Sequence, residues 1–191
     1  MRLLKAKPKY YQEAYRFDEK EKAYRIEVSL DAYEDVYDEW DPSPFKKRDI
    51  EDEFDDFIMD SSSDIPPRFN LMIDLYIPSE VKNAVKEKLL IEAYDNFYRF
   101  KYRRALKERQ SLSKKVIANF VLAIIFLFIG YFYEPGIDSI FLMIIKEGLF
   151  IGGWVFLWEV FTLIFITLVE ENRALKAIHR LVNAKIRFHY E

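Results

Sequence analysis

Two long apolar stretches dominate the second half of the chain. Residues 116–133 carry no charged side chain, and residues 148–169 carry one, Glu159. At ~1.5 Å per residue the first stretch extends about 27 Å, which is close to the ~30 Å hydrocarbon core of a bilayer. The pattern therefore predicts two transmembrane helices and disfavours a buried helical pair in a soluble core.

The connection between these stretches contains a turn signal, Glu134-Pro135-Gly136, followed by the apolar residues 137–145. Nine residues are too few to cross a bilayer. We expect either a segment at the membrane interface or an extension of the second helix.

Shorter periodic segments fill the first half of the chain. Apolar and polar residues alternate over residues 24–30 and 68–77, which predicts two half-buried β-strands. Between them, apolar residues at helical spacing predict one helix capped by Asp31 and a second from about Asp49. This order favours a parallel crossover. Since two strands do not form a stable sheet, we expect a third from residues 9–17 or from a neighbouring subunit.

A long helical pattern joins the two halves. After Ser79, a possible helix cap, apolar residues recur at helical spacing from Val81 to Phe100, and Gly130 is the only breaker before Tyr133. We therefore expect one helix that continues into the first span. The predicted fold class is an α+β membrane protein: a small cytoplasmic α/β domain (1–78), a long amphipathic and basic connecting helix (79–115), a transmembrane hairpin (116–169) and a cytoplasmic helical tail (170–191).

Charge is divided along the chain in the same blocks. The first 98 residues carry a net charge of −9 and residues 99–115 carry +7, although the whole chain carries only −3. Eight Lys or Arg precede the first span, five follow the second, and only Lys146 lies between them. Because cytoplasmic flanks are enriched in Lys and Arg, we expect both termini in the cytoplasm.

The basic flank Arg99–Lys115 has a further consequence. Its charges attract anionic lipid headgroups, so the bilayer itself is an expected partner. Aromatic residues lie among the basic ones, as in some nucleic-acid sites, but the adjoining domain is acidic and would repel phosphate. The sequence therefore disfavours nucleic acid as a partner.

Composition removes the common catalytic chemistries. The chain has no Cys, two His and five Gly, which leaves no thiolate site, His-rich zinc site or glycine-rich phosphate loop. The acidic run Asp49–Asp60 offers oxygen ligands for Mg²⁺ or Ca²⁺, but it lacks the EF-hand glycine and its period fits a helix with a solvated acidic face. We therefore predict no enzyme activity, no cofactor and no catalytic or metal-binding residue.

Small and polar residues share one narrow stripe of the second span. The stripe contains Gly148, Gly152, Val155, Glu159 and Thr162. Glycines four residues apart allow close helix approach, so Gly148, Gly152, Val155 and Thr162 predict a helix-packing or oligomer face. A charged carboxylate inside a span is costly, and we expect no Lys or Arg at the depth of Glu159. Glu159 is then a protonated or hydrogen-bonded packing residue, part of a ring that lines a pore, or a residue near the interface of a displaced span.

The segment DPSPFKKRD is a candidate loop site in the first half. Its prolines favour extended backbone, and Asp41 or Ser43 can close a turn. Phe45 is expected to fill the core, and Arg48 to form an ion-paired anchor. The alternative is a ligand-binding loop formed by Asp41, Ser43, Phe45, Arg48 and Asp49.

Two segments carry a resemblance to a known family. Residues 41–58 read DPSPFKKRDIEDEFDDFI, and residues 146–158 read KEGLFIGGWVFLW. In this order they resemble a family of small, uncharacterised bacterial two-pass membrane proteins, which carries a DPSPF-x-x-RD motif in a cytoplasmic domain and an EGL-x-I-x-GWV-x-x-W motif in its second span. The matching positions are Asp41, Pro42, Ser43, Pro44, Phe45, Arg48, Asp49, Glu147, Gly148, Gly153, Trp154, Val155 and Trp158.

The resemblance covers most of the chain, from about Tyr24 onward. It implies a two-pass protein of the bacterial inner (plasma) membrane, and it implies no known activity. Just after Trp158 the chain departs from the family, whose members often continue with Arg-Pro and an aromatic ending, because it reads Glu159-Val160. The resemblance therefore gives no role to Glu159.

Three functional hypotheses follow. The first is an inner-membrane protein that self-associates through its spans and whose cytoplasmic domain binds a partner or a small signal. The second is a membrane effector or ion channel that a ligand or partner gates through the long helix. The third, least favoured, is a membrane-tethered metal-dependent enzyme that uses the acidic run.

Overall fold

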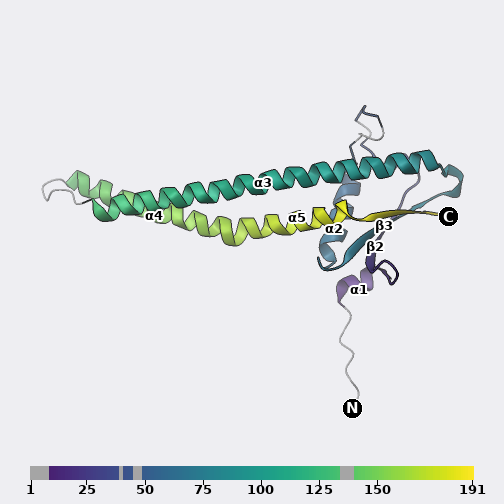
Figure 1. Ribbon diagram of the computed structural model, residues 1–191, viewed down its shortest axis with the longest axis horizontal. Coiled ribbons are helices and arrows are strands. Elements are labelled where there is room, and N and C mark those ends of the chain that lie inside the picture. Colours follow the sequence, from purple (N-terminus) through teal and green to yellow (C-terminus); the bar gives the residue numbers. More distant parts are fainter. Residues whose placement is uncertain (1–8, 39–40, 45–48, 134–139) are drawn as a thin grey trace, which may run out of the picture. The chain divides into compact units, whose positions relative to one another are not determined.

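The computed structural model describes residues 9–38, 41–44, 49–133 and 140–191. The chain divides into two compact units, which we call the sheet unit and the hairpin unit (Figure 1). The sheet unit comprises the residues up to Arg103 together with residues 175–191, and the hairpin unit comprises residues 104–174. Helices α3 (Ala84–Phe132) and α5 (Leu168–Val182) contribute residues to both. The fold is α+β, with one small sheet and long helices, in agreement with the predicted class.

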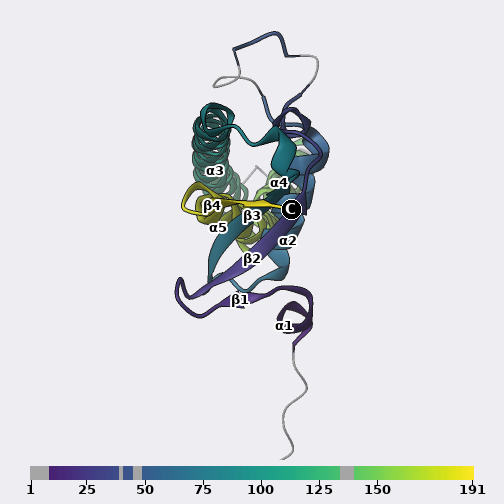
Figure 2. The ribbon, with the colours of Figure 1, turned by 90° about the vertical axis from the view of Figure 1, so that its right-hand side faces the viewer.

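A four-stranded sheet organises the sheet unit (Figure 2). Its strands are β1 (Phe17–Asp18), β2 (Ala23–Ser29), β3 (Asn70–Ile77) and β4 (Lys185–Tyr190), which lie in that order. β1 is antiparallel to β2, whereas β2, β3 and β4 are parallel. The parallel crossover between the two predicted strands is therefore confirmed.

The third parallel strand comes from the end of the chain, where a helical tail was predicted. Helix α5 ends at Val182, and β4 then pairs with β3 from Met72↔Lys185 to Ile77↔Tyr190. The prediction of a helix is wrong for these six residues, because Ile186, Phe188 and Tyr190 alternate with Lys185, Arg187 and His189, and this period of two suits a sheet.

Residues 9–17, one of the two expected sources of a third strand, supply only the first residue of β1. They form the short helix α1 (Tyr10–Ala14), and only Phe17 continues into β1. Tyr11 is buried in α1 and packs edge-on against Tyr24, with ring centroids 5.4 Å apart. A helical turn presents this one aromatic ring to the core, whereas an alternating strand would present several.

Two predicted helix starts also differ from the structure. Only one 3₁₀ turn, η1 (Tyr33–Val36), follows Asp31, and the carboxylate of Asp35 rather than that of Asp31 accepts the N–H groups at its start. The turn ends because Tyr37 pairs with Ile50 in an antiparallel bridge. The second predicted helix, expected from about Asp49, forms as α2 (Asp52–Asp64) and begins three residues later.

The long helix begins later than Ser79. Residues Ser79–Val81 form the short 3₁₀ turn η3, and α3 follows at Ala84. The side chain of Asn83 accepts the N–H groups of Val85 and Lys86 at 2.9 and 3.2 Å, so Asn83 is the helix cap. From there α3 runs without a break to Phe132, which confirms one continuous helix.

One face of the sheet forms the core of the sheet unit. Side chains of Ile26, Ile73 and Leu75 on this face have no exposed surface. Helices α2, α3 and α5 add the fully buried residues Ile58, Leu90, Tyr98 and Leu181. Each fully buried aliphatic side chain contributes about 1.5–3 kcal/mol relative to exposure, so apolar burial holds the parallel strands and the helices together.

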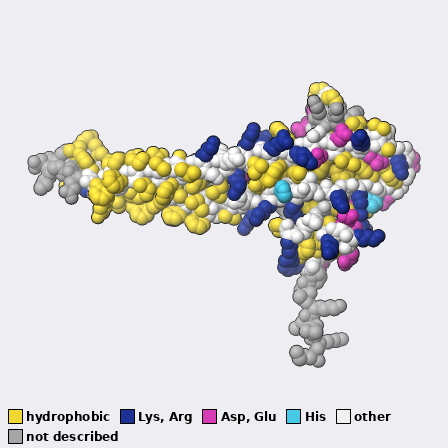
Figure 3. All heavy atoms as spheres, viewed as in Figure 1, with side chains coloured by type: hydrophobic (Ala, Val, Ile, Leu, Met, Phe, Trp, Pro, Cys, Tyr) yellow, Lys and Arg dark blue, Asp and Glu magenta, His cyan; other side chains and the backbone are white. Residues whose placement is uncertain are grey.

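The hairpin unit contains the two apolar stretches. α4 (Ile140–Thr162) continues through a π-helical turn, η4 (Leu163–Thr167), into α5. The helices Ala84–Phe132 and Ile140–Val182 are both long and apolar enough to cross a membrane. Figure 3 shows hydrophobic side chains gathered over α4 and the neighbouring part of α3. Residues 140–145 belong to α4, so an extension of the second helix is confirmed for them, and residues 134–139 lie outside the described part of the chain.

Candidate functional site

The polar face of the sheet carries a network of ion pairs to which each strand contributes one residue: Asp18 from β1, Arg25 from β2, Asp74 from β3 and Arg187 from β4. Arg187 donates to both carboxylate oxygens of Asp74, from Nε at 2.9 Å and from Nη2 at 3.1 Å. Arg25 Nη2 donates to Asp18 Oδ2 at 2.6 Å, and Arg187 Nη2 lies 3.3 Å from the same oxygen. We call these four residues the ion network.

Both carboxylates of the ion network are removed from solvent. Asp74 has no exposed surface, and Asp18 is 5% exposed. Asp18 also accepts the backbone N–H groups of Lys20 and Glu21 in the turn that follows β1. The N–H of Glu21 and then the guanidinium of Arg25 hold the pKa of Asp18 well below its usual range. The hydrogen bonds that Arg187 donates to Asp74 raise the pKa of the Arg187 guanidinium.

This arrangement fastens the strands of the sheet together. Two guanidinium groups neutralise two carboxylates, and His189 Nε2 lies 3.4 Å from Asp74 Oδ1. Among the described residues, no group of three or more His, Asp and Glu side chains could hold a metal ion. The ion network therefore ties β4, which follows the hairpin unit in the chain, to strands that precede it.

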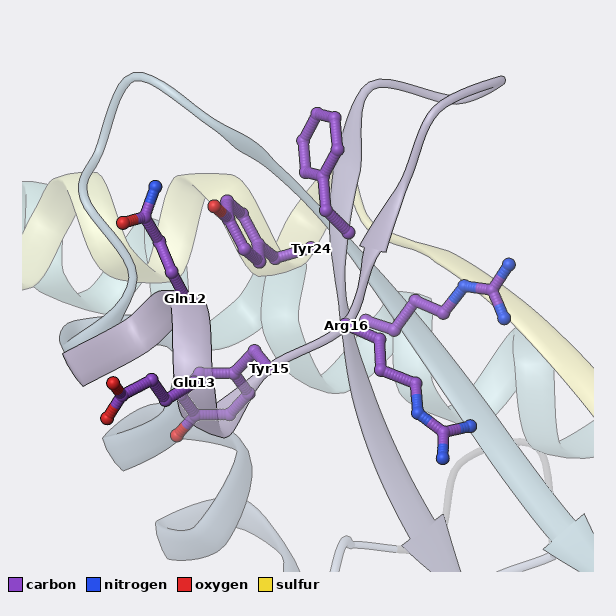
Figure 4. A pocket seen from close by; sticks show the side chains of 7 residues that line it. Gln12, Glu13, Tyr15, Arg16 and Tyr24 are labelled. Carbon is purple, nitrogen blue, oxygen red and sulfur yellow. The ribbon is translucent and has the colours of Figure 1, made fainter. Parts of the chain in front are cut away.

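An open groove of about 670 Å³ lies beside the ion network (Figure 4). Residues from α1, β1 and β2 line it: Gln12, Glu13, Tyr15, Arg16, Phe17, Tyr24 and Arg25. Its two arginines already face carboxylates, since Arg16 Nη1 lies 3.5 Å from Glu27 and Arg25 pairs with Asp18. Burial raises the pKa of the Tyr15 hydroxyl, which donates to Asp64 at 3.0 Å.

The acidic run lies on α2, and one of its carboxylates is not solvated. Asp55 is 7% exposed, accepts a hydrogen bond from Tyr98 at 2.9 Å, and forms an ion pair with Lys101. Burial raises the pKa of Tyr98, so this hydroxyl stays protonated as a donor. The solvated-face interpretation is therefore wrong for Asp55, although Asp52, Glu53, Asp56 and Asp60 are exposed.

The described part of the DPSPF segment, residues 41–44, forms a turn around the carboxylate of Asp41. Asp41 accepts the backbone N–H of Ser43 at 2.9 Å and that of Asp49 at 2.7 Å. The prediction that Asp41 or Ser43 closes a turn is confirmed for Asp41. Phe45 and Arg48 lie outside the described residues, and the ligand-loop alternative stays a prediction.

The glycines of the hairpin unit fall into two groups. A Cβ added at Gly130 would lie 3.0 Å from the backbone of Phe150, and one at Gly153 would lie 2.9 Å from the backbone N of Leu127. These two glycines allow α3 and α4 to approach closely. At Gly148 and Gly152 an added Cβ would meet nothing within 4 Å.

The first part of the predicted packing face, from Gly148 to Val155, thus points away from α3. Val155 is 62% exposed, and the hydroxyl of Thr162 donates to Trp158 O at 3.2 Å within its own helix. Packing within one chain therefore accounts for Gly130 and Gly153 but not for Gly148 and Gly152.

Glu159 has a counter-charge in its own chain. Lys115 Nζ lies 3.9 Å from Glu159 Oε1, and both side chains are partly exposed. The expectation of no Lys or Arg near Glu159 is wrong, because depth was judged along the second helix alone. In the antiparallel hairpin, the part of α3 around Lys115 lies beside Glu159 of α4. The three alternatives for the role of Glu159 stay predictions.

Sequence reasoning missed the ion network, since Asp18 and Arg25 look like ordinary surface charges and β4 was not recognised. The alternation in KIRFHY, with three polar residues on one face, was the available signal.

No family model matches this chain, and no curated protein or solved structure matches it. The resemblance to uncharacterised two-pass membrane proteins therefore stays a prediction.

Proposed function

We propose that this chain is a two-pass membrane protein that self-associates through α4 and presents its sheet unit to the cytoplasm. The observation that carries the membrane location is the exposure of large apolar side chains around the hairpin unit. Trp158 is 74% exposed and Phe165 is 69% exposed, and many Ile, Leu and Val side chains are exposed beside them. Soluble proteins rarely expose so large an apolar surface, whereas lipid covers it at no cost.

Strand pairing supports a two-pass topology. β3 precedes both apolar helices and β4 follows them, yet β3 and β4 pair along six residues. Both segments must then lie on the same side of any membrane that the two helices cross, as two crossings require. The Lys and Arg residues that flank the helices support the cytoplasm as that side, because cytoplasmic flanks are enriched in these residues.

The part of α3 that precedes the first apolar stretch, residues 104–115, carries charges that suit anionic lipid headgroups. Lys107, Arg109 and Lys114 are exposed on α3, and none of them pairs with a carboxylate among the described residues. Each Lys or Arg close to an anionic membrane surface contributes about 1 kcal/mol of attraction. These charges anchor the inner end of the first span.

Self-association is supported by the two outward-facing glycines. Gly148 and Gly152 leave a shallow apolar face on α4 that the chain itself does not use. Close approach of a helix from a second copy gives such glycines a packing role. Ion-channel activity is not part of the proposal, because Lys115 supplies a counter-charge to Glu159 and removes the reason for a ring of carboxylates.

The topology is tested by cysteine labelling, which suits a chain without natural cysteine. Single substitutions Lys20→Cys and Lys185→Cys place thiols on exposed positions of the sheet unit. We expect a membrane-impermeant maleimide to label both only from the cytoplasmic side. Labelling of either one from the outside would refute the topology.

Self-association is tested by cross-linking in native membranes. Gly148→Leu and Gly152→Leu are expected to abolish the cross-linked species, whereas Phe161→Leu, at an exposed apolar position on another face of α4, serves as the matched control. A monomeric wild-type chain would refute self-association, and unchanged cross-linking of both glycine variants would refute this face.

A further inference from the structure

A second cavity, of about 440 Å³, lies in the hairpin unit near the ends of α3 and α4 that face the connecting loop. Gly130 and Tyr131 of α3 and Lys146, Glu147, Phe150 and Ile151 of α4 line it. Gly130 makes the floor, because its missing side chain lets the backbone of Phe150 approach. The rings of Tyr131 and Phe150 and the side chain of Ile151 make its walls largely apolar.

Two opposite charges line this cavity, and neither has a partner among the described residues. No hydrogen bond or ion pair joins Lys146 or Glu147 to any other described residue. They are consecutive in α4, so their side chains diverge by about 100° and do not face each other. Apolar residues precede and follow them in the helix. Charged side chains near a helix end keep access to the hydrated edge of a membrane, and the cavity gives both of them access to one ligand.

We infer that this cavity binds a phospholipid headgroup that carries a primary ammonium group beside its phosphate, as in phosphatidylethanolamine. Lys146 receives the phosphate, and Glu147 accepts hydrogen bonds from the ammonium group. The apolar walls receive the glycerol and the first methylenes of the acyl chains. The inference rests on the proposed membrane location of the hairpin unit.

Charge complementarity selects this headgroup over the common alternatives. A headgroup with a phosphate but no cation, as in phosphatidylglycerol, satisfies Lys146 and leaves Glu147 unpaired. A quaternary ammonium, as in phosphatidylcholine, brings the positive charge but has no N–H to donate to Glu147. The primary ammonium is the one that satisfies both side chains.

The test measures lipid retention by the full chain. The protein is purified in detergent, incubated with an equimolar mixture of phosphatidylethanolamine, phosphatidylglycerol and phosphatidylcholine, and examined by native mass spectrometry. We expect retention of one phosphatidylethanolamine per chain in clear preference to the other two lipids. Glu147→Gln is expected to reduce this preference about tenfold or more, as the loss of a charge-assisted hydrogen bond implies. Lys146→Gln is expected to remove retention of all three.

The matched controls are Glu108→Gln and Arg173→Gln, which remove one charge of each sign elsewhere on the hairpin unit and are expected to change nothing. Equal retention of the three lipids by the wild-type chain, or Glu147→Gln and Lys146→Gln variants that behave like the controls, would overturn the inference. Displacement of the lipid by an equal concentration of soluble phosphoethanolamine would overturn the assignment of a lipid as the source of the headgroup.

Resistance to alkaline carbonate extraction separates this inference from the proposed function. A wild-type chain that is extracted from membranes defeats the membrane location itself. A chain that stays embedded and retains no lipid selectively defeats only the assignment of the cavity.

Discussion

Substitution Arg187→Met removes the residue through which β4 engages the ion network. Asp74 then loses two hydrogen bonds, at 2.9 and 3.1 Å, and keeps only Arg25 Nε at 3.7 Å and His189 Nε2 at 3.4 Å. Because Asp74 has no exposed surface, water cannot replace the lost donors. We expect β4 to separate from β3 far more often in the variant.

The size of the effect follows from burial. Breaking a buried ion pair costs about 3–5 kcal/mol, but the side chain of Arg187 is 36% exposed and solvent screens part of its interaction. We therefore expect a loss of about 2–4 kcal/mol in the free energy of opening, which is roughly a 30- to 700-fold increase in the population of the open state.

Amide hydrogen exchange of the full chain measures this opening locally. Peptides that cover β3 and β4 are expected to exchange faster by that factor, while peptides from α4 stay unchanged. Lys185→Met is the matched control, because Lys185 lies on the same face of β4 and its ion pair with Glu21 is exposed. Exposed pairs of this kind contribute about 0–1 kcal/mol.

Asp74→Asn tests whether the buried, unpaired charge of Asp74 causes the loss of stability in Arg187→Met. It removes the buried charge, and Arg187 can still reach water and Asp18, so the expected effect is smaller than that of Arg187→Met. Two results would contradict the reasoning. One is an amide exchange rate of the β3 and β4 peptides in Arg187→Met that stays within threefold of wild type. The other is a larger increase of that rate in Asp74→Asn than in Arg187→Met.

Three further predictions follow from the described contacts. Gly153→Ala places a Cβ against the neighbouring helix and is expected to destabilise the hairpin unit by about 1–3 kcal/mol. Gly152→Ala, where the added Cβ meets nothing, is expected to be neutral or slightly stabilising. The loss of helicity with increasing concentration of a denaturing detergent compares the two variants. Tyr98→Phe leaves buried Asp55 without one donor and is expected to cost about 1–3 kcal/mol in thermal unfolding; an unchanged midpoint refutes it. The folded-state pKa of Asp18 is depressed, so its stabilisation is complete above the unfolded value of about 3.9 and is lost as the pH falls below it; Asp18→Asn should flatten the acid branch of the unfolding curve.

Local periodicity was sufficient to predict the central strands and the long helix. The alternation over residues 24–30 and 68–77 is confirmed by β2 and β3, and the unbroken helical spacing is confirmed by α3. Both patterns depend on side chains within one segment. Helix starts were less accurate, because Asn83 and Asp35 compete for backbone N–H groups with the caps that the sequence favoured.

The contacts between distant segments could not be predicted in the same way. Arg187 and Asp74 are 113 positions apart, and Lys115 reaches Glu159 only because two helices run antiparallel. Among the candidate site residues, Asp41 could be assigned to a turn because its partners are close in sequence. Which glycines face a neighbouring helix depends on the register of the hairpin, and one helical wheel cannot supply it.

The position of β4 in the chain also orders the events of biosynthesis. The edge of β3 and the carboxylate of Asp74 wait for a strand that is translated only after both apolar helices. Until then β3 is an open sheet edge beside a carboxylate that lacks Arg187, and such edges are sites of aggregation and of protease attack. In the proposed two-pass topology, a chain whose second helix alone fails to insert would leave β4 on the opposite side of the membrane from β3, and the sheet could not be completed.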